Sequence, residues 1–233
     1  MDISNAILEC KIDTTGLRVL DLSNKNINAF GGIIFWPELE ELILDNNAIT
    51  VRDEQDVIAI NESNIKKLSM RNNGITDSFY ISDLTTPNMD FSFNKITDFD
   101  VIKAAKNINL SHNKLVSLST KAVVDYLDVQ YNDLASIDGI YATNLSADFN
   151  KIMSIENYVA PAQLIRLSLS NNMIKTIGTI DTNNMQSCDI SKNPYSTITQ
   201  LSIKKRMRNF KTSTNLIEIN RIEMEGGCTI SHM

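Results

Sequence analysis

Side chains that could do acid–base, nucleophilic or metal chemistry are few in this sequence and lie far apart. The 233-residue chain holds two histidines and three cysteines, namely His112, His232, Cys10, Cys188 and Cys228. Zinc sites need such residues at close, repeated spacing, and no C-x-x-C occurs here. Glycine-rich phosphate-binding motifs are likewise missing from the sequence. Carboxylate pairs such as Asp53 and Glu54 show no sign of burial, so we expect no enzyme activity, no cofactor and no metal site.

These scattered groups lie within a repeated motif, L-x-x-L-x-L-x-x-N-x-I, that fills most of the chain. Nine copies begin at Leu17, Leu39, Ile65, Thr86, Ala105, Val124, Ala142, Leu164 and Met185. The ninth position is Lys25 in the first copy and asparagine in the other eight: Asn47, Asn73, Asn94, Asn113, Asn132, Asn150, Asn172 and Asn193. Successive ninth positions lie 18 to 26 residues apart. Self-similarity of this kind indicates a solenoid of stacked repeats.

The motif resembles that of the leucine-rich-repeat family, and the resemblance covers residues 17 to about 200. It implies an α/β solenoid of about nine repeats, in which each L-x-L segment is a short strand of one concave parallel sheet and the convex side is irregular or carries short helices. It also implies that the asparagines turn inward to hydrogen-bond backbone groups, which buried amides require. Lys25 departs from the pattern in a terminal repeat, where one neighbour is missing.

The remaining segments should close the two ends of the array and fill one insertion. We expect residues 1–16 to form an N-terminal cap, residues 17–195 the repeats, and residues 196–233 a C-terminal cap. The longest copy contains residues 51–63, which we expect to form a loop or a short helix. Within the C-terminal cap, residues 200–210 place Leu201, Met207 and Phe210 for a helix with one apolar face, and residues 215–224 alternate like a strand.

Charge and hydropathy restrict the partners and the compartment. The net charge of -6 argues against non-specific binding to nucleic acid or to an anionic membrane. No run of roughly 18 apolar residues predicts a membrane span, and the first residues lack a secretory signal. As written the chain would be cytoplasmic, or extracellular if it is a trimmed ectodomain. Cys10 and Cys228 flank the array and are too far apart to pair, so only Cys188 could pair with Cys228; we expect free thiols.

The outward face of the predicted sheet is mildly acidic. Alternate strand residues point to opposite sides, so motif positions three, five and seven should face outward. Seven acids stand there against three bases: Asp21, Glu41, Asp45, Asp90, Asp128, Asp148 and Asp189 against Lys67, Arg71 and Arg166. Such a face could suit a basic or hydroxyl-rich partner, and a solvated face without a partner would look the same.

Position eight carries a run of ring side chains in four successive copies: Phe93, His112, Tyr131 and Phe149. At ~4.8 Å between strands these rings should stack into a ladder along one rim. The ladder could anchor a partner, or it could be a packing spine of the solenoid. Together with Tyr126 and three carboxylates it forms our candidate contact patch: Asp90, Phe93, His112, Tyr126, Asp128, Tyr131, Asp148 and Phe149.

The function we expect from these features is non-catalytic binding of a protein or peptide through the concave face and the adjoining rim. An alternative is the ligand-sensing ectodomain of a receptor-like kinase, which the chain resembles in the W-P before its second repeat and the N-P-x-x-T-I after its last. A purely structural subunit of an assembly is a third possibility. The sequence leaves the oligomeric state and the partner open.

Overall fold

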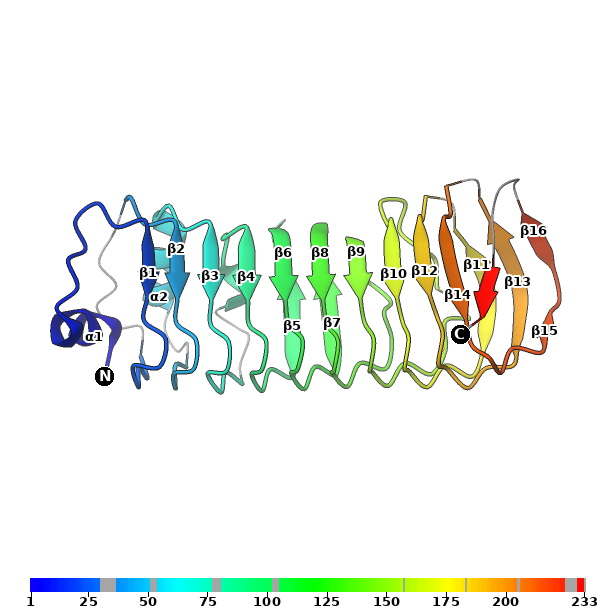
Figure 1. Ribbon diagram of the computed structural model, residues 1–233, viewed down its shortest axis with the longest axis horizontal. Coiled ribbons are helices and arrows are strands. Elements are labelled where there is room, and N and C mark those ends of the chain that lie inside the picture. Colours follow the sequence, from blue (N-terminus) through cyan, green and yellow to red (C-terminus); the bar gives the residue numbers. More distant parts are fainter. Residues whose placement is uncertain are drawn as a thin grey trace.

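The protein is an elongated solenoid whose long axis runs across the strands (Figure 1). The computed structural model describes residues 1–29, 37–50, 54–76, 81–101, 105–156, 158–182, 184–204, 206–224 and 230–232. The N-terminus and the C-terminal residues lie at opposite ends of the long axis (Figure 1). The predicted solenoid with one long parallel sheet is confirmed.

One parallel sheet of eleven strands runs the length of the molecule. Its strands in spatial order are β1 (Val19–Asp21), β2 (Glu41–Ile43), β3 (Lys67–Ser69), β4 (Asn88–Asp90), β6 (Ala105–Asn109), β8 (Val124–Asp128), β9 (Ala142–Ser146), β10 (Arg166–Ser168), β12 (Ser187–Asp189), β14 (Asn209–Thr212) and β17 (Ile230–His232). Pairing keeps motif positions in register, so that Leu42 lies opposite Leu68 and Leu68 opposite Met89. The same register repeats from copy to copy, so equivalent side chains form continuous columns.

The core consists of the columns that point inward from this sheet. Position four is buried in every repeat strand of the main sheet from β1 to β12, and positions six and eleven lie beside it in the interior. In the second copy Leu42, Leu44 and Ile49 are all fully buried. Each such side chain contributes roughly 1.5–3 kcal/mol relative to an exposed one. Columns of this kind explain why three-residue strands are stable here.

The opposite side of the solenoid carries strands in some copies and a helix or a 3-10 turn in others. Four further segments are parallel strands of a second sheet: β11 (Ile177–Asp181), β13 (Thr197–Ile203), β15 (Glu218–Ile219) and β16 (Ile222–Met224). Two more, β5 (Asp98–Val101) and β7 (Ser117–Thr120), form a separate pair. The longest copy carries the helix α2 (Glu54–Glu62), and the next copy carries the 3-10 turn η1 (Ile81–Asp83). The short helix predicted within residues 51–63 is therefore confirmed, although residues 51–53 lie outside the described part of the chain.

A helix covers the N-terminal end of the array. In α1 (Ile3–Cys10) the Asp2 side chain accepts a hydrogen bond from the Asn5 backbone N–H, which caps the helix. Ile3 is fully buried against the core, and the Asn28 backbone N–H donates to the Met1 carbonyl at 2.9 Å. The helix thereby packs on the core at the end that lacks a neighbouring repeat.

The helix predicted for residues 200–210 is wrong, because residues 200–203 are the end of β13 and residues 209–210 are the start of β14. Leu201 and Ile203 are buried in the second sheet, while Phe210 is buried under the main sheet opposite Cys188. The apolar spacing that suggests one helical face is equally that of two strands joined by a turn. The strand predicted over residues 215–224 is confirmed in part, as the two short strands β15 and β16.

The main sheet also continues past residue 195 through β14 and β17, so the last strands extend the same solenoid (Figure 1). Cys228 lies outside the described residues, so the free thiol expected there stays a prediction. Among the described cysteines, Cys10 and Cys188 are free thiols.

Candidate functional site

Each asparagine at position nine connects two rungs of the solenoid through its side chain. In the central copy, the Asn132 Nδ2 donates to the carbonyls of Leu110 at 2.9 Å and of Val129 at 3.0 Å. Its Oδ1 accepts from the Leu115 backbone N–H at 2.9 Å. Leu110 and Leu115 belong to the preceding copy and Val129 to the same copy. One amide thus satisfies backbone groups in two turns that no strand ladder reaches.

The same pattern recurs through all eight copies, which we call the asparagine ladder: Asn47, Asn73, Asn94, Asn113, Asn132, Asn150, Asn172 and Asn193. Seven of them are buried, and Asn47 near the N-terminal end is half-buried. In the first copy Lys25 contributes its backbone N–H to Asn47 Oδ1 at 3.0 Å. The asparagine ladder therefore begins in the second copy, because the ninth position of the first copy is lysine.

The residues just before these asparagines share an unusual backbone. Every position-eight residue is left-handed, with φ between 51° and 59°: Asn24, Asn46, Asn72, Phe93, His112, Tyr131, Phe149, Asn171 and Lys192. Their backbone N–H groups extend the pairing by one step, as where Tyr131 donates to the Asp148 carbonyl at 3.1 Å. Asparagine tolerates this conformation best after glycine, and most other residues pay roughly 1–2 kcal/mol. Four copies place rings at this position, although asparagine would adopt the left-handed backbone at a lower free-energy cost.

The four rings stack on one another without a break, and we call them the ring ladder. Centroids of Phe93 and His112 lie 4.2 Å apart, and the next two pairs are each 4.3 Å apart. Interplanar angles of 8° to 11° make the rings nearly parallel. Each stacked pair is worth ~0.5–1.5 kcal/mol, so the three pairs offset part of the backbone cost of the four residues. The predicted continuous ladder is present.

Stacking decides which parts of the rings a partner could touch. Phe93, Tyr131 and Phe149 are 44%, 43% and 41% exposed, and His112 is half-buried. Because neighbouring rings cover one another's faces, the exposed parts are ring edges. The outer face of Phe93 is covered too, since the Arg71 guanidinium carbon lies 5.2 Å from its ring centroid. Between the rings, this surface therefore offers ring edges for apolar contact.

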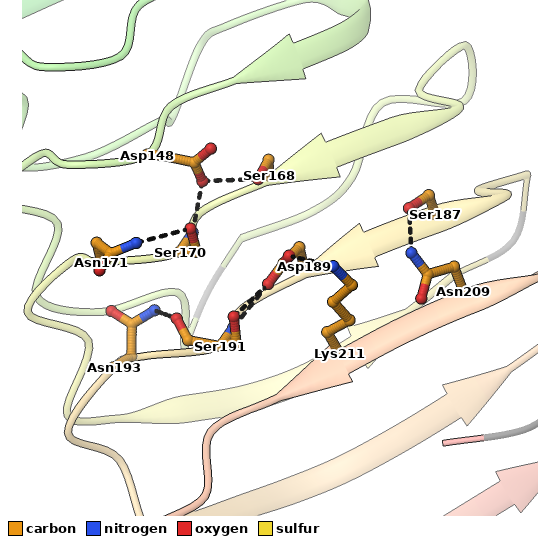
Figure 2. A network of polar contacts seen from close by, with 10 residues as sticks. All are labelled: Asp148, Ser168, Ser170, Asn171, Ser187, Asp189, Ser191, Asn193, Asn209 and Lys211. Atoms are coloured by element: carbon orange, nitrogen blue, oxygen red, sulfur yellow. Dashed lines mark hydrogen bonds and ion pairs between the residues drawn. The ribbon is translucent and has the colours of Figure 1, made fainter. Parts of the chain in front are cut away.

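The three predicted carboxylates have structural partners at the ends of the strands. Asp90 Oδ1 accepts from the Ser92 backbone N–H at 2.9 Å, and Asp128 Oδ1 accepts from the Gln130 N–H at 3.0 Å. Asp148 reaches across to the next copy instead. Its Oδ1 accepts from the Ser170 N–H at 2.7 Å (Figure 2). All three side chains are half-buried.

Two arrangements therefore give the same result at the end of a strand. Where position five is aspartate, it binds the N–H two residues on, as Asp189 does with Ser191 (Figure 2). Two of the three copies with serine at position five use an aspartate at position seven of the preceding copy. This aspartate binds both the serine hydroxyl and that N–H, as Asp148 does with Ser168 (Figure 2). Much of the acidity of the face is explained by these turns.

The surroundings of Asp128 disfavour the charged form of its carboxylate. Burial raises the pKa of Asp128, and the nearby Asp148 and Asp90 raise it further. The hydrogen bonds from Gln130 act in the opposite direction and lower the pKa of Asp128. Because burial is the largest of these effects, the carboxylate sits in a poorly solvated part of the face.

Tyr126 is the large side chain that stands out of the sheet face between two hollows. Its side chain is 44% exposed on β8. A hollow of about 390 Å³ lies on its N-terminal side, lined by Glu41, Lys67, Asn88, Asp90 and Asn107 among others. A hollow of about 250 Å³ lies on its C-terminal side, lined by Asn144, Arg166, Ser187, Asn209 and Lys211 among others. One tyrosine thus borders both.

The eight residues predicted as one contact patch form two groups. Tyr126 is at position three, whereas the ring ladder is at position eight, so the two lie ~15 Å apart along the strand direction at ~3.3 Å per residue. The carboxylates lie between them. A partner that touches both groups must span most of the width of the sheet.

The sequence prediction missed Asn209 and Lys211, which line the C-terminal hollow, because it ended the repeats at residue 195 and expected a helix over residues 200–210. Lys211 Nζ pairs with Asp189 at 3.4 Å and lines the C-terminal hollow (Figure 2). The signal for them is a tenth copy of the motif starting at Met207, with Phe210 at position four. Asn215 at its ninth position is exposed, so this copy does not continue the asparagine ladder.

Within the described ranges no group of three or more histidine, cysteine or acidic side chains could hold a metal ion. The helices in that part of the chain are too short and too polar to cross a membrane.

Comparison with known proteins bears on the family and the fold. No family model matches this sequence. Lumican from Homo sapiens is 25% identical over 235 residues, which cover 92% of this chain and 68% of that protein. Lumican from Bos taurus is 24% identical over the same shares.

Two solved structures share the fold. The leucine-rich-repeat domain of APL1 superposes with a TM-score of 0.61 at 19% identity, covering 84% of this chain and 57% of that one. The LRIM1/APL1C complex gives a TM-score of 0.61 at 18% identity, over 87% of this chain and 42% of the other. This chain therefore spans less than two thirds of those solved chains. The repeated motif, the parallel solenoid and these likenesses together identify the chain as a leucine-rich-repeat protein.

Proposed function

We propose that this protein is a non-catalytic binding module that holds a protein or peptide partner against the outward face of its main sheet and the adjoining ring ladder. The observation that carries the proposal is the position of Tyr126, 44% exposed between two hollows of the face. A rigid aromatic flanked by hollows is the arrangement that interface hot spots use. The surrounding strands fix it, because its strand pairs on both sides.

The two hollows would receive different side chains of a partner. The N-terminal hollow is lined by Glu41 and Asp90 with Lys67 as its base, whereas the C-terminal hollow is lined by Arg166 and Lys211 with one acid. Complementary charge would fix the direction in which a partner lies along the solenoid. We infer a partner segment with a basic or hydroxyl-rich part toward β3 and an acidic part toward β10.

The carboxylates support binding rather than catalysis. Asp90, Asp128 and Asp148 each use an oxygen to hold a backbone N–H at the end of a strand. Groups engaged in this way position a surface and do not move freely to transfer protons. A related observation comes from the fold neighbours, since one of them was solved as the LRIM1/APL1C complex.

The test is a comparison of two tyrosines of similar exposure. Tyr126→Ala removes the side chain between the hollows, and Tyr141→Ala removes a tyrosine that is 46% exposed and lines neither hollow. We expect a partner captured by the unmodified chain and identified by mass spectrometry to bind Tyr126→Ala at least tenfold more weakly, as hot spots do at ~2 kcal/mol or more. Tyr141→Ala should bind with unchanged Kd.

Equal Kd values for the two variants would remove the sheet face as the binding surface. A receptor-like-kinase ectodomain and a structural subunit remain the alternative roles. For the structural role, the captured partner would bind both variants alike in a stoichiometric complex.

A further inference from the structure

The interior of the solenoid contains a cavity of about 360 Å³ near its C-terminal end. It lies behind the main sheet and is distinct from the hollows of the sheet face. Its walls include Leu167 of β10, Cys188 of β12 and Ile180 of β11, together with Ile155 and Tyr158 from the segment that joins β9 to β10. The volume falls within the ~300–1,000 Å³ typical of small-molecule sites.

The shape of the joining segment accounts for the cavity. This copy is longer than the preceding one, since its ninth positions, Asn150 and Asn172, are 22 residues apart, and Asn132 and Asn150 only 18. Some of the added chain turns outward, and Val159 is 85% exposed. The segment is nonetheless fixed at one point. A Cβ at Gly178 of β11 would lie 2.3 Å from the Glu156 carbonyl oxygen, so only glycine permits this close approach.

Tyr158 lines the cavity and has a hydroxyl that the fold does not satisfy. The hydroxyl oxygen of Tyr158 is shielded from solvent and has no hydrogen-bond partner among the described residues. Native structures rarely leave such a group unpaired. The contrast is Tyr195, whose hydroxyl accepts from the Ser213 backbone N–H at 2.9 Å. Burial raises the pKa of Tyr158, so its phenol keeps its proton at neutral pH and is available as a donor.

The charges on the cavity wall select among possible ligands. Glu156 and Asp181 contribute to the lining, and no lysine or arginine of the described chain does. The remaining wall is mostly aliphatic, including Ile155, Met185 and Ile190. A carboxylate or phosphate ligand would meet repulsion from the two acids. A neutral molecule would not.

We propose that this cavity binds a small neutral molecule with an apolar body and one carbonyl oxygen, which accepts a hydrogen bond from the Tyr158 hydroxyl. The aliphatic wall buries the apolar body, and the phenol fixes its orientation. The site is independent of the sheet face, so it stands or falls separately from the binding proposed there.

The experiment titrates the full chain with 2-decanone and follows the methyl signals of the cavity wall by NMR. We expect saturable binding that shifts the signals of Ile155, Leu167 and Met185. Decanoate, of similar length but anionic, should bind at least about tenfold more weakly, because it meets the two carboxylates. Ala160→Phe, which fills the cavity wall beside Tyr158, should abolish binding of 2-decanone.

Two tyrosine variants isolate the hydrogen bond. Tyr158→Phe keeps the apolar wall and should weaken 2-decanone about fivefold, the usual net effect of one hydrogen bond. Tyr195→Phe removes a hydroxyl that is already paired and should leave the affinity unchanged, although it lowers stability. Equal affinity in the unmodified chain and Tyr158→Phe, equal binding of decanoate, or shifts away from the cavity wall would each overturn the proposal. If Ala160→Phe fails to fold, the Tyr158→Phe comparison alone decides it.

Discussion

Two neighbouring columns of the solenoid, at motif positions eight and nine, obey different rules although they are adjacent in every copy. Position nine is asparagine in all copies but the first. Position eight is asparagine in the first three copies and in the eighth, a ring in the four copies between them, and lysine in the ninth. The difference follows from what each column must do. A position-nine side chain satisfies buried backbone groups of two rungs, whereas a position-eight residue need only accept a left-handed backbone.

The residue type at a position is therefore fixed by the hydrogen bonds that its side chain must make, and not by the left-handed conformation of its backbone. Asn46 and Asn72 hydrogen-bond each other at 2.9 Å in the position-eight column. A few copies later, stacked rings take over the same column at 4.2 to 4.3 Å. Amide hydrogen bonds and stacked rings are thus both compatible with the same left-handed backbone. The residue type at position eight can therefore vary without loss of the fold.

The largest expected effect is at position nine. Asn132→Leu removes the acceptor for the Leu115 N–H and the donor to the Leu110 carbonyl, leaving buried groups unpaired. We expect a loss of ~2–4 kcal/mol in the free energy of unfolding, measured by urea denaturation. The control is Asn107→Leu, at an exposed amide of the sheet face, which should cost well under that. A similar loss in both variants would contradict the special role of the inner column.

A smaller effect is expected at position eight. Tyr131→Ala removes stacking with His112 and Phe149 while the backbone stays left-handed. It should cost ~1–2 kcal/mol. Tyr131→Asn loses the same stacking but suits the left-handed backbone, so its cost should be about half as large. Thermal unfolding of the two variants checks this order, and a reversed order would show that the backbone does not matter at this position.

A double variant of the ring ladder tests whether its rings contact a partner. Tyr131→Asn combined with Phe149→Asn should leave the protein folded and weaken the captured partner. Unchanged affinity of a folded double variant would assign the ring ladder to packing alone.

The smallest expected effect concerns pH. Because burial raises the pKa of Asp128, the folded state holds its proton more tightly than the unfolded state. Ionised Asp128 therefore costs stability, and the cost develops as pH rises from the ordinary aspartate value of 3.8 through the raised one. Asp128→Asn should be at least as stable as the unmodified protein at pH 7, by less than ~1 kcal/mol after screening by solvent. The gain should vanish near pH 3 in urea denaturation.

The opposite sign is expected at the equivalent position of the first copy. Hydrogen bonds from Ser23 lower the pKa of Asp21, so its contribution to stability is present above the ordinary value and is lost as pH falls through the lowered one. Asp21→Asn should therefore destabilise the protein at pH 7 and have no effect at low pH. Equal pH profiles for the two variants would contradict the effect of burial along the face.

The sequence predicted the sheet and the inward columns because both depend on simple alternation. The ninth-position asparagines mark every turn, and the apolar residues four and six places into each copy mark every strand. The helix prediction for the stretch from Leu201 to Phe210 was wrong because the apolar residues there fit one helical face as well as two strands. Only the weaker tenth copy from Met207 favours the strands.

The candidate site was harder to predict than the fold. Alternation identifies Asp148 as outward but does not reveal that it holds the Ser170 N–H of the next copy. The left-handed backbone of Phe93 leaves no mark in the sequence, since a ring is an unexpected residue there. The unpaired hydroxyl of Tyr158 depends on the path of a connecting segment, which follows no motif.

Main-sheet strands pair only with the strands beside them, from β1 to β17. Tension applied at the two ends of the chain would pass through every rung in turn, and the outermost rung is the one paired on a single side. The outermost rung would detach first, and each detachment would expose the next, so the molecule should lengthen stepwise under force instead of rupturing in one event. Such behaviour would let the protein extend gradually under force while its remaining rungs stay folded.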